Sequence, residues 1–274
     1  MKFQYLGTAA SEGIPAMFCH CEVCKTARKN GGKDIRGRSG GVVNDKVMID
    51  FPPDAYFHSL RFNIDLGGLE GLFFTHSHSD HCDMIQLEYR KLGGLCTLEE
   101  NQPPLKVYGN KKVREMFEHE GYHHDTASFE FIEVVPYQKY EVAGITVTPL
   151  PAAHNPDELC LIYLIEDNGK RMIYGNDTTY FHEEVLDFLS GTHLDIVSLD
   201  CTSGLGEEHT RHMGLKDCVK LKNDLISRKS ADDNTIFIIT HFSHGGESVL
   251  HEQLEKGAKA VNFEVAYDGR VVCL

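Results

Sequence analysis

A run of metal-ligating side chains directly after a short apolar segment constrains this chain more than any other feature. The segment Leu72–Thr75 predicts a buried strand, and it is followed by His76, His78, Asp80 and His81. Side chains two residues apart in extended chain point to the same side, so His76 and His78 can reach one metal ion. Asp80 and His81 can hold a second ion, since two-metal hydrolytic sites keep their ions about 3.5–4 Å apart. The run favours a dinuclear metal site over a polar loop of solvated histidines.

Three more residues of ligand type follow predicted strands further along the chain. His154 comes after residues 149–153, Asp177 after the strand pattern 171–174, and His241 after the apolar strand pattern 235–240. Loops that follow strands often carry catalytic groups. We therefore expect these three side chains to complete the ligand set.

Short strand patterns recur along the whole chain, with helical patterns between them. Turn residues at 44–45, 167–169 and 268–269 predict hairpins. Helical patterns cover residues 83–92, 183–189, 215–226 and 247–256. This alternation predicts an α/β (α+β) protein in which two sheets are covered on their outer faces by helices. No stretch is long enough to be a linker, so residues 1–274 are expected to form a single domain.

Nine cysteines are an odd number, which argues against a disulfide framework. Cys19, Cys21 and Cys24 cluster in a C-x-C-x-x-C pattern and can bind one structural zinc if a fourth ligand joins them. His244 is the first candidate for that ligand. His20 competes with it, although a residue between two ligating cysteines is poorly aimed at their metal.

The balance of charge and apolar residues narrows the partners and the location. The formal net charge is -14, which repels a long polyanion, so we expect a small substrate and no nucleic acid. No apolar run approaches the roughly 20 residues of a membrane span. Met1–Gly7 lacks the pattern of a secretory signal, so a soluble, cytoplasmic protein is expected.

Taken together, these motifs resemble the metallo-β-lactamase superfamily, whose signature is His-x-His-x-Asp-His followed by a distant His, Asp and His. The resemblance covers residues 72–241 and implies a four-layer αββα sandwich. It implies a first metal held by His76, His78 and His154. It implies a second metal held by Asp80, His81 and His241, with Asp177 bridging the two ions.

Two positions narrow the resemblance within the superfamily. An aspartate at 177 is typical of the phosphodiesterase, glyoxalase and lactonase branches, and not of the enzymes that open β-lactams. His78 stands where the oxygen-reducing flavodiiron proteins have a glutamate, so that branch is disfavoured. Histidine and aspartate ligands accept Zn, Mn or Fe, so the sequence leaves the active-site metals open.

The two ends of the chain resemble one subfamily in particular. Tyr5–Pro15 with the cysteine cluster, and Thr240–His244, resemble the accessory phosphodiesterase of the carbon–phosphorus lyase pathway. A related N-terminal pattern occurs in the accessory protein of pyrroloquinoline quinone biosynthesis. The resemblance implies His244 as the structural-zinc ligand, hydrolysis of a small or cyclic phosphodiester, and a possible homodimer.

The leaving group of such a reaction needs a proton, and His212 is the best candidate to supply it. It precedes the helical pattern 215–226, and the relatives have a general-acid histidine at a comparable place with the signature aspartate, here Asp80, as its partner. His209 is the fallback. Metal-bound hydroxide is the expected nucleophile.

Three alternatives remain open. The first is another hydrolase of the same fold, such as a lactonase or thioesterase, and the second is a non-catalytic carrier like the quinone-biosynthesis relative. A tRNA-processing nuclease is disfavoured because the chain lacks a long basic, glycine-rich arm. His119, His123 and His124 are either solvated or in contact with a phosphate.

Overall fold

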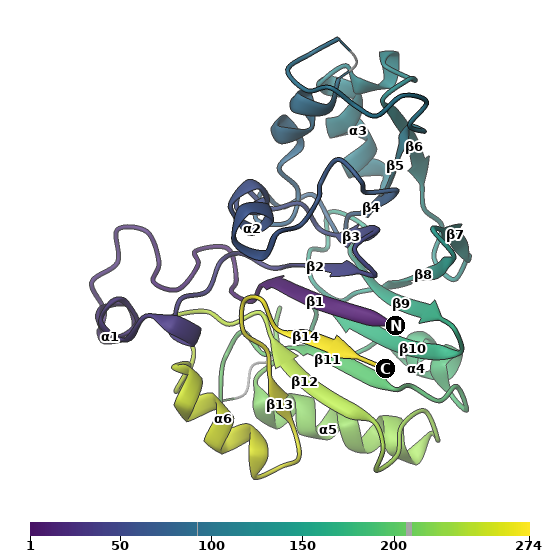
Figure 1. Cartoon of the computed structure of the whole chain (residues 1–274). Helices are drawn as coiled ribbons and strands as arrows, with labels where there is room; N and C mark the ends of the chain where they lie inside the picture. Colours follow the sequence, from purple (N-terminus) through teal and green to yellow (C-terminus); the bar gives the residue numbers. More distant parts are fainter. Residues whose placement is uncertain (92, 207–209) are drawn as a thin grey trace.

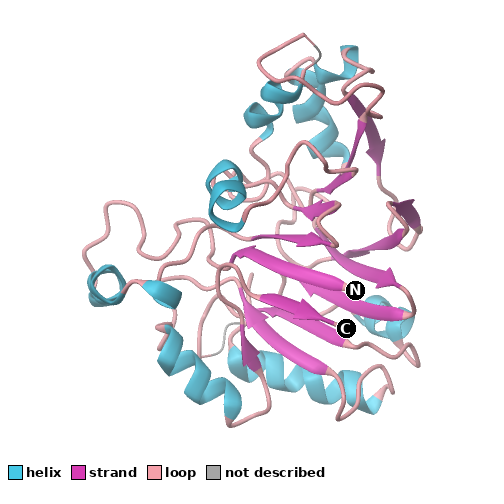
Figure 2. Cartoon of the chain, in the orientation of Figure 1, coloured by secondary structure: helices cyan, strands magenta, loops and turns pink. Residues whose placement is uncertain are grey.

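Two β-sheets lie face to face in the computed structural model, which describes residues 1–91, 93–206 and 210–274 (Figure 1; Figure 2). The first sheet has the order β14-β1-β2-β3-β4-β5-β6 and comprises β1 (Lys2–Gly7), β2 (Gly40–Val43), β3 (Val47–Ile49), β4 (Gly71–Phe73), β5 (Leu105–Gly109), β6 (Phe129–Glu133) and β14 (Val271–Cys273). The second has the order β13-β12-β11-β10-β9-β8-β7 and comprises β7 (Tyr140–Val142), β8 (Ile145–Pro151), β9 (Leu161–Asp167), β10 (Lys170–Gly175), β11 (Ile196–Asp200), β12 (Ile236–Thr240) and β13 (Glu264–Val265).

The inner faces of the sheets form a shared aromatic and aliphatic core. Phe73 of the first sheet meets Tyr163 of the second at 5.5 Å between ring centroids, and Phe3 meets Tyr174 at 5.6 Å. All four rings are almost completely buried, and such burial of apolar area is the main force that holds two sheets together.

Helices cover the outer face of each sheet. On the second sheet these are α4 (Glu183–Leu189), α5 (Leu215–Ser227) and α6 (His251–Lys259), and on the first they are α2 (Ala55–Phe62), the 3₁₀ helix η2 (Met84–Arg90) and α3 (Lys111–His119). Shorter or peripheral helices are α1 (Glu22–Asn30), η1 (Gly32–Asp34) and η3 (Tyr122–His124). The four layers confirm the predicted αββα sandwich (Figure 1). Among the helices of the described ranges, none has the length and apolar content that a membrane span requires.

The predicted hairpin across residues 268–269 is wrong. β13 pairs with β12 in the second sheet, whereas β14 pairs with β1 in the first. The amide of Gly269 donates to the carbonyl of Tyr5, and the amide of Tyr5 donates to the carbonyl of Arg270. The turn therefore carries the chain from one sheet to the other, because the unpaired edge of β1 offers the hydrogen bonds that β14 needs.

Two predicted helices differ from the structure. Of the pattern at 83–92, residues 84–90 form the 3₁₀ helix η2, and Leu92 lies outside the described residues. The hydroxyl of Tyr122 donates to the carbonyl of Met84 at 2.9 Å, which competes with α-helical pairing. The pattern at 247–256 becomes helical only at His251. Glu247 before it is held in an extended bridge, with its amide donating to Ser203 and its carbonyl accepting from Leu205.

Candidate metal centre

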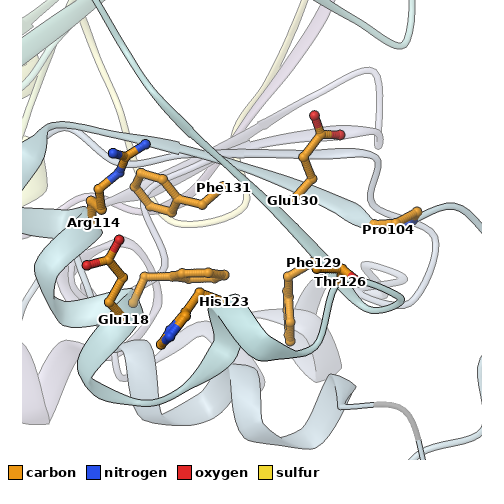
Figure 3. Close-up of a pocket in the computed structure, with 9 residues that line it drawn as sticks. Pro104, Arg114, Glu118, His123, Thr126, Phe129, Glu130 and Phe131 are labelled. Carbon is orange, nitrogen blue, oxygen red and sulfur yellow. The ribbon is translucent and has the colours of Figure 1, made fainter.

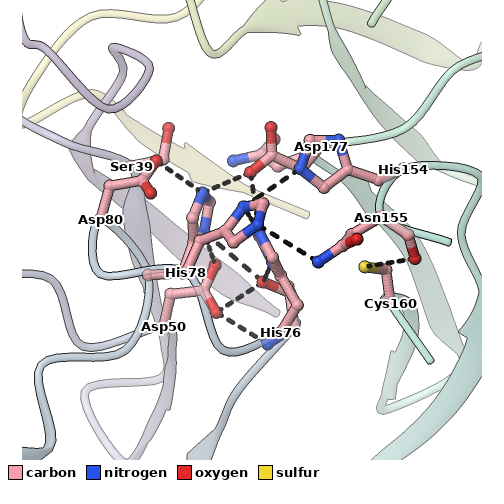
Figure 4. A network of polar contacts seen from close by, with 12 residues as sticks. Ser39, Asp50, His76, His78, Asp80, His154, Asn155, Cys160 and Asp177 are labelled. Atoms are coloured by element: carbon pink, nitrogen blue, oxygen red, sulfur yellow. Dashed lines mark hydrogen bonds and ion pairs between the residues drawn. The ribbon is translucent and has the colours of Figure 1, made fainter. Parts of the chain in front are cut away.

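The predicted ligands gather where strands of both sheets end. His76, His78, Asp80 and His81 follow β4, His154 follows β8, Asp177 follows β10, and His241 follows β12. Strands β8, β10 and β12 run in the same direction within their sheet, so their carboxyl ends lie along one edge. Residues that are 165 positions apart in sequence, such as His76 and His241, are thereby brought into one site (Figure 4 labels several of its residues).

Three histidines form the first ligand group. Nε2 of His76 lies 2.9 Å from Nδ1 of His78, and Nε2 of His154 lies 3.3 Å from the same Nδ1. Ring nitrogens that face one another at these distances can converge on a single cation, which is the arrangement a three-histidine metal site requires.

Asp177 joins this triad to a second ligand group made of Asp80, His81 and His241. Its Oδ2 lies 2.5 Å from Nε2 of His81 and 3.5 Å from Nε2 of His76, while its Oδ1 lies 3.3 Å from Nε2 of His241. Oδ2 of Asp80 lies 3.2 Å from Nε2 of His81. The carboxylate of Asp177 thus contacts both groups, as a bridging ligand would.

Hydrogen bonds to the opposite ring nitrogens orient the histidines. Nδ1 of His81 donates to Asp50 at 2.7 Å, and Nδ1 of His154 donates to the carbonyl of Arg211 at 3.3 Å. The hydroxyl of Thr202 donates to the carbonyl of His241, so it accepts from Nδ1 of the same residue at 2.8 Å. In the neutral form of each ring, Nε2 then carries the lone pair that a metal ligand needs, and it faces the site.

The buried carboxylates and imidazoles of the site favour a bound cation. Burial opposes a charge on His81, but Asp177 and Asp50 outweigh it and raise the pKa of His81 well above its usual value. Burial likewise opposes ionisation of Asp177, yet His241 and His81 hold the pKa of that carboxyl well below its usual range. The Nε2 atoms of His81 and His241 are buried and lie against the carboxylate of Asp177 without the geometry of a hydrogen bond. These nitrogens and carboxylates fit divalent metal ions.

A second cluster, made of cysteines and one histidine, lies beside α1. The Sγ atoms of Cys19 and Cys21 lie 3.7 and 3.4 Å from Nδ1 of His244, and Sγ of Cys24 belongs to the same group. His20, the competing candidate, is exposed and is not part of this group. Three thiols and one imidazole fit a closed tetrahedral zinc site.

His212 lies at the rim of the first cluster, with its ring centroid 5.1 Å from that of His154. Its Nδ1 lies 2.9 Å from Oδ2 of Asp200 and 3.4 Å from Oδ1 of Asp177. The expected partner, Asp80, lies next to His81 instead. The carboxylate that reaches His212 is that of Asp200, at the end of β11. His209, the fallback, lies outside the described residues.

With this geometry established, comparison with known proteins identifies the family. A family model described as the beta-lactamase superfamily domain matches residues 46–242, most of the chain. The chain belongs to the metallo-β-lactamase superfamily. The predicted family is confirmed, and the chain has the metal-dependent hydrolase fold of that superfamily.

Solved structures of this superfamily match the chain over its whole length. A diphosphatase of the PhnP family is 23% identical, with a TM-score of 0.77 over 100% of this chain and 97% of the other. The zinc-bound PqqB of Methylobacterium extorquens is 17% identical, with a TM-score of 0.71 over 100% of both chains. A curated relative, an octanoyltransferase of Porphyromonas gingivalis, is 28% identical over 166 residues. That match covers 56% of this chain, but the chain spans only 31% of the relative.

Several residues of the site belong to no sequence motif, and the sequence analysis did not predict them. Glu158 accepts hydrogen bonds from the amide and hydroxyl of Ser77 at 3.0 and 2.8 Å, and from Asn110 and Asn155 at 3.0 and 3.2 Å. It clamps the loop that carries His76 and His78. Asp50 follows β3, Asp200 is the last residue of β11, and Glu158 lies shortly before β9, so closeness to a strand end is the local feature that these three residues share.

Two hollows flank α3. One, of about 440 Å³, lies between α3 and β6 and is lined in part by Arg114, Glu118 and His123 (Figure 3). The other, of about 560 Å³, includes His119 and reaches the metal-site loop. Like His119 and His123, His124 is exposed.

Proposed function

We propose that this chain is a phosphodiesterase that hydrolyses a small or cyclic phosphodiester with two divalent metal ions. The observation that carries the proposal is the joint placement of two ligand groups sharing Asp177 and of the pair His212–Asp200 at their rim. The net charge of -14 supports a small substrate over a nucleic acid.

In the proposed mechanism the chain positions three kinds of group. When bound, the divalent ions activate water and neutralise charge on the phosphoryl oxygens. Asp50, Thr202 and the carbonyl of Arg211 hold the ligand histidines in the required tautomer and orientation. Asp200 holds Nδ1 of His212, so Nε2 is the nitrogen that gives its proton to the departing oxygen of the ester.

The fold neighbours support this class of reaction over the alternatives. The PhnP-family structure with the same fold is described as a diphosphatase, and this supports the proposal of phosphoryl chemistry. The PqqB structure binds zinc on the same fold, so zinc binding by itself does not distinguish an enzyme from a carrier. The paired His212 and Asp200 favour an enzyme, since a carrier has no need of a proton donor.

The cysteine cluster and the assembly of the molecule belong to the same proposal. Cys19, Cys21, Cys24 and His244 would hold one structural zinc. Zn, Mn and, less typically, Fe suit the active-site ligands. A cytoplasmic homodimer with residues 1–274 as a single domain stays a prediction.

Metal analysis combined with a substrate panel tests the proposal. Protein loaded with Zn or Mn is expected to hold three ions per chain and to hydrolyse bis(p-nitrophenyl) phosphate faster than a lactone or a thioester. Asp177→Asn should lower both metal content and turnover, whereas the matched exposed variant Asp233→Asn should change neither. Fully metal-loaded protein that cleaves the lactone or thioester instead, or cleaves nothing, would reject the phosphodiesterase assignment.

A further inference from the structure

The hollow of about 560 Å³ adjoins the loop that carries the metal ligands. Its lining includes Ser79 and Cys82 of that loop, Met84 and Ile85 of η2, and Lys112 and Met116 of α3. Ser79 stands between His78 and Asp80 in the chain and is exposed, so the hollow begins one residue from ligands of both groups. Its volume lies in the usual range of small-molecule sites.

The chemistry of the lining is mainly apolar. Met84, Ile85, Met116 and Pro53 supply aliphatic surface, and Ile85 is 69% exposed although it is a large hydrophobic residue. On α3, residues 112, 115, 116 and 119 share one helical face, which therefore faces the hollow, and Glu120, the C-cap residue, also lines it. Methionine side chains adapt to ligands of different shape. The surface suits a planar or branched hydrocarbon group.

The charges at the rim argue against a second anionic group. Asp83, Glu115 and Glu120 line the hollow, against Lys112 and His119. An additional phosphate on the substrate would be repelled by three carboxylates there, whereas an uncharged group would not. The hollow thus differs from a pocket built for a nucleotide or a sugar bisphosphate.

We propose that this hollow receives an uncharged, apolar ester group, aryl or alkyl, of the phosphodiester whose phosphoryl centre lies at the metal ligands. This assignment rests on the proposed phosphodiesterase function, because it needs the phosphoryl group to lie beside Ser79. It names the substrate class as a diester with one hydrophobic substituent.

Binding of two non-hydrolysable phosphonates tests the assignment without turnover. Calorimetry on the metal-loaded protein should show phenylphosphonate binding at least about tenfold more tightly than methylphosphonate, since a ring fills the hollow and a methyl group does not. Ile85→Glu and Met116→Glu should each abolish this preference. Repulsion between the new carboxylate and the phosphonate affects both ligands alike and cancels in the ratio of their Kd values. Leu60→Glu, at a hydrophobic residue of similar exposure (64%) outside the lining, is the matched control and should keep the preference.

Equal affinity for the two phosphonates in the wild-type protein, or no binding of either, would overturn the assignment. So would a preference that both glutamate variants retain. The bis(p-nitrophenyl) phosphate assay reports separately on the proposed function. Turnover of that diester without a phenyl preference rejects only the hollow. A phenyl preference without turnover rejects the phosphodiesterase activity and the ester-group assignment with it, and leaves the hollow as a binding site for an apolar group.

Discussion

At the scale of single residues, Asp200 shows how one buried carboxylate orients the proposed proton donor. Its side chain is fully buried at the end of β11, and its Oδ1 accepts from the amides of Thr202 and Met213 at 3.0 and 3.2 Å. Its Oδ2 lies 2.9 Å from Nδ1 of His212 and 3.6 Å from Nδ1 of His241. The two backbone bonds fix the plane of the carboxylate, so the position of His212 follows from the fold of the β11 end.

His212→Asn should retain full metal content and lose activity according to the leaving group. A general acid typically contributes about 10²–10⁴-fold, and most where the leaving oxygen is basic. We therefore expect the largest fall in kcat for an alkyl diester and a smaller one for bis(p-nitrophenyl) phosphate. An equal fall for both substrates would point to a structural role. A loss of metal would identify His212 as a metal ligand, since it lies close to Asp177 and His241.

Asp200→Asn should lower kcat with little change in KM or metal content, because Asp200 acts through His212. The double variant with His212→Asn should then be little worse than His212→Asn alone, since residues that act as a unit are not additive. Steady-state kinetics on the four proteins give this comparison. Multiplied losses in the double variant would separate the two roles.

At the scale of elements, helix α1 begins at the cysteine cluster. The side chain of Cys21 is its N-cap and accepts from the amide of Cys24 at 3.4 Å. The hydrogen bond from the Cys24 amide, together with the contact to His244, lowers the pKa of the Cys21 thiol to about 6. The start of a helix thus favours the thiolate form, which is the form that binds zinc.

Cys21→Ser should reduce the metal content by one zinc per chain and lower Tm, while the active-site metals still load. Serine is a good N-cap, so the loss reports on the zinc and not on the helix. Cys273→Ser, at an exposed cysteine, should have no effect and serves as the control. Elemental analysis that finds an unchanged zinc count in Cys21→Ser would refute the structural site.

At the scale of the whole molecule, stability toward acid depends on histidines buried without charge. His58 on α2 is 1% exposed, and neither of its ring nitrogens has a hydrogen-bond partner within the described residues. Burial, with a smaller contribution from Arg61, lowers its pKa to about 4 against the opposing effect of Asp54. The unfolded chain binds a proton at His58 below its ordinary pKa of 6.5, whereas the folded chain does so only below about 4.

The sign follows from this difference in proton binding. The contribution of His58 to stability is fully present above pH 6.5 and falls as the pH decreases toward 4, because only the unfolded state gains the proton. His58→Gln should remove about 2 kcal/mol of the stability difference between pH 7 and pH 5. Urea unfolding of wild type and variant at both pH values measures it, and contributions of the metal ligands cancel in the comparison. The exposed control His124→Gln should behave as wild type, and an equal pH dependence in His58→Gln would contradict the argument.

The sequence by itself determined those features that depend on a few neighbouring residues. The turn at Asn44-Asp45 joins β2 to β3 as expected, with φ of 49° and 57°, because these residue types tolerate the left-handed conformation that the turn requires. Helix α4 covers residues 183–189 as predicted. The signature run follows its strand β4, and its order of residues was specific enough to indicate the superfamily.

Only the tertiary structure decided which distant groups meet. β13 and β14 lie in different sheets because each strand pairs with an edge that is otherwise unpaired. The residues of the turn between them do not determine which edge that is. Asp50, Glu158 and Asp200 are single acidic residues without a motif, and their roles depend on distances of about one hydrogen bond to side chains far away in sequence. The run His76–His81 was recognisable from the order of its residues alone. The carboxylates that contact its histidines, the carboxylate that orients His212 and the apolar hollow beside the run all depend on packing between layers.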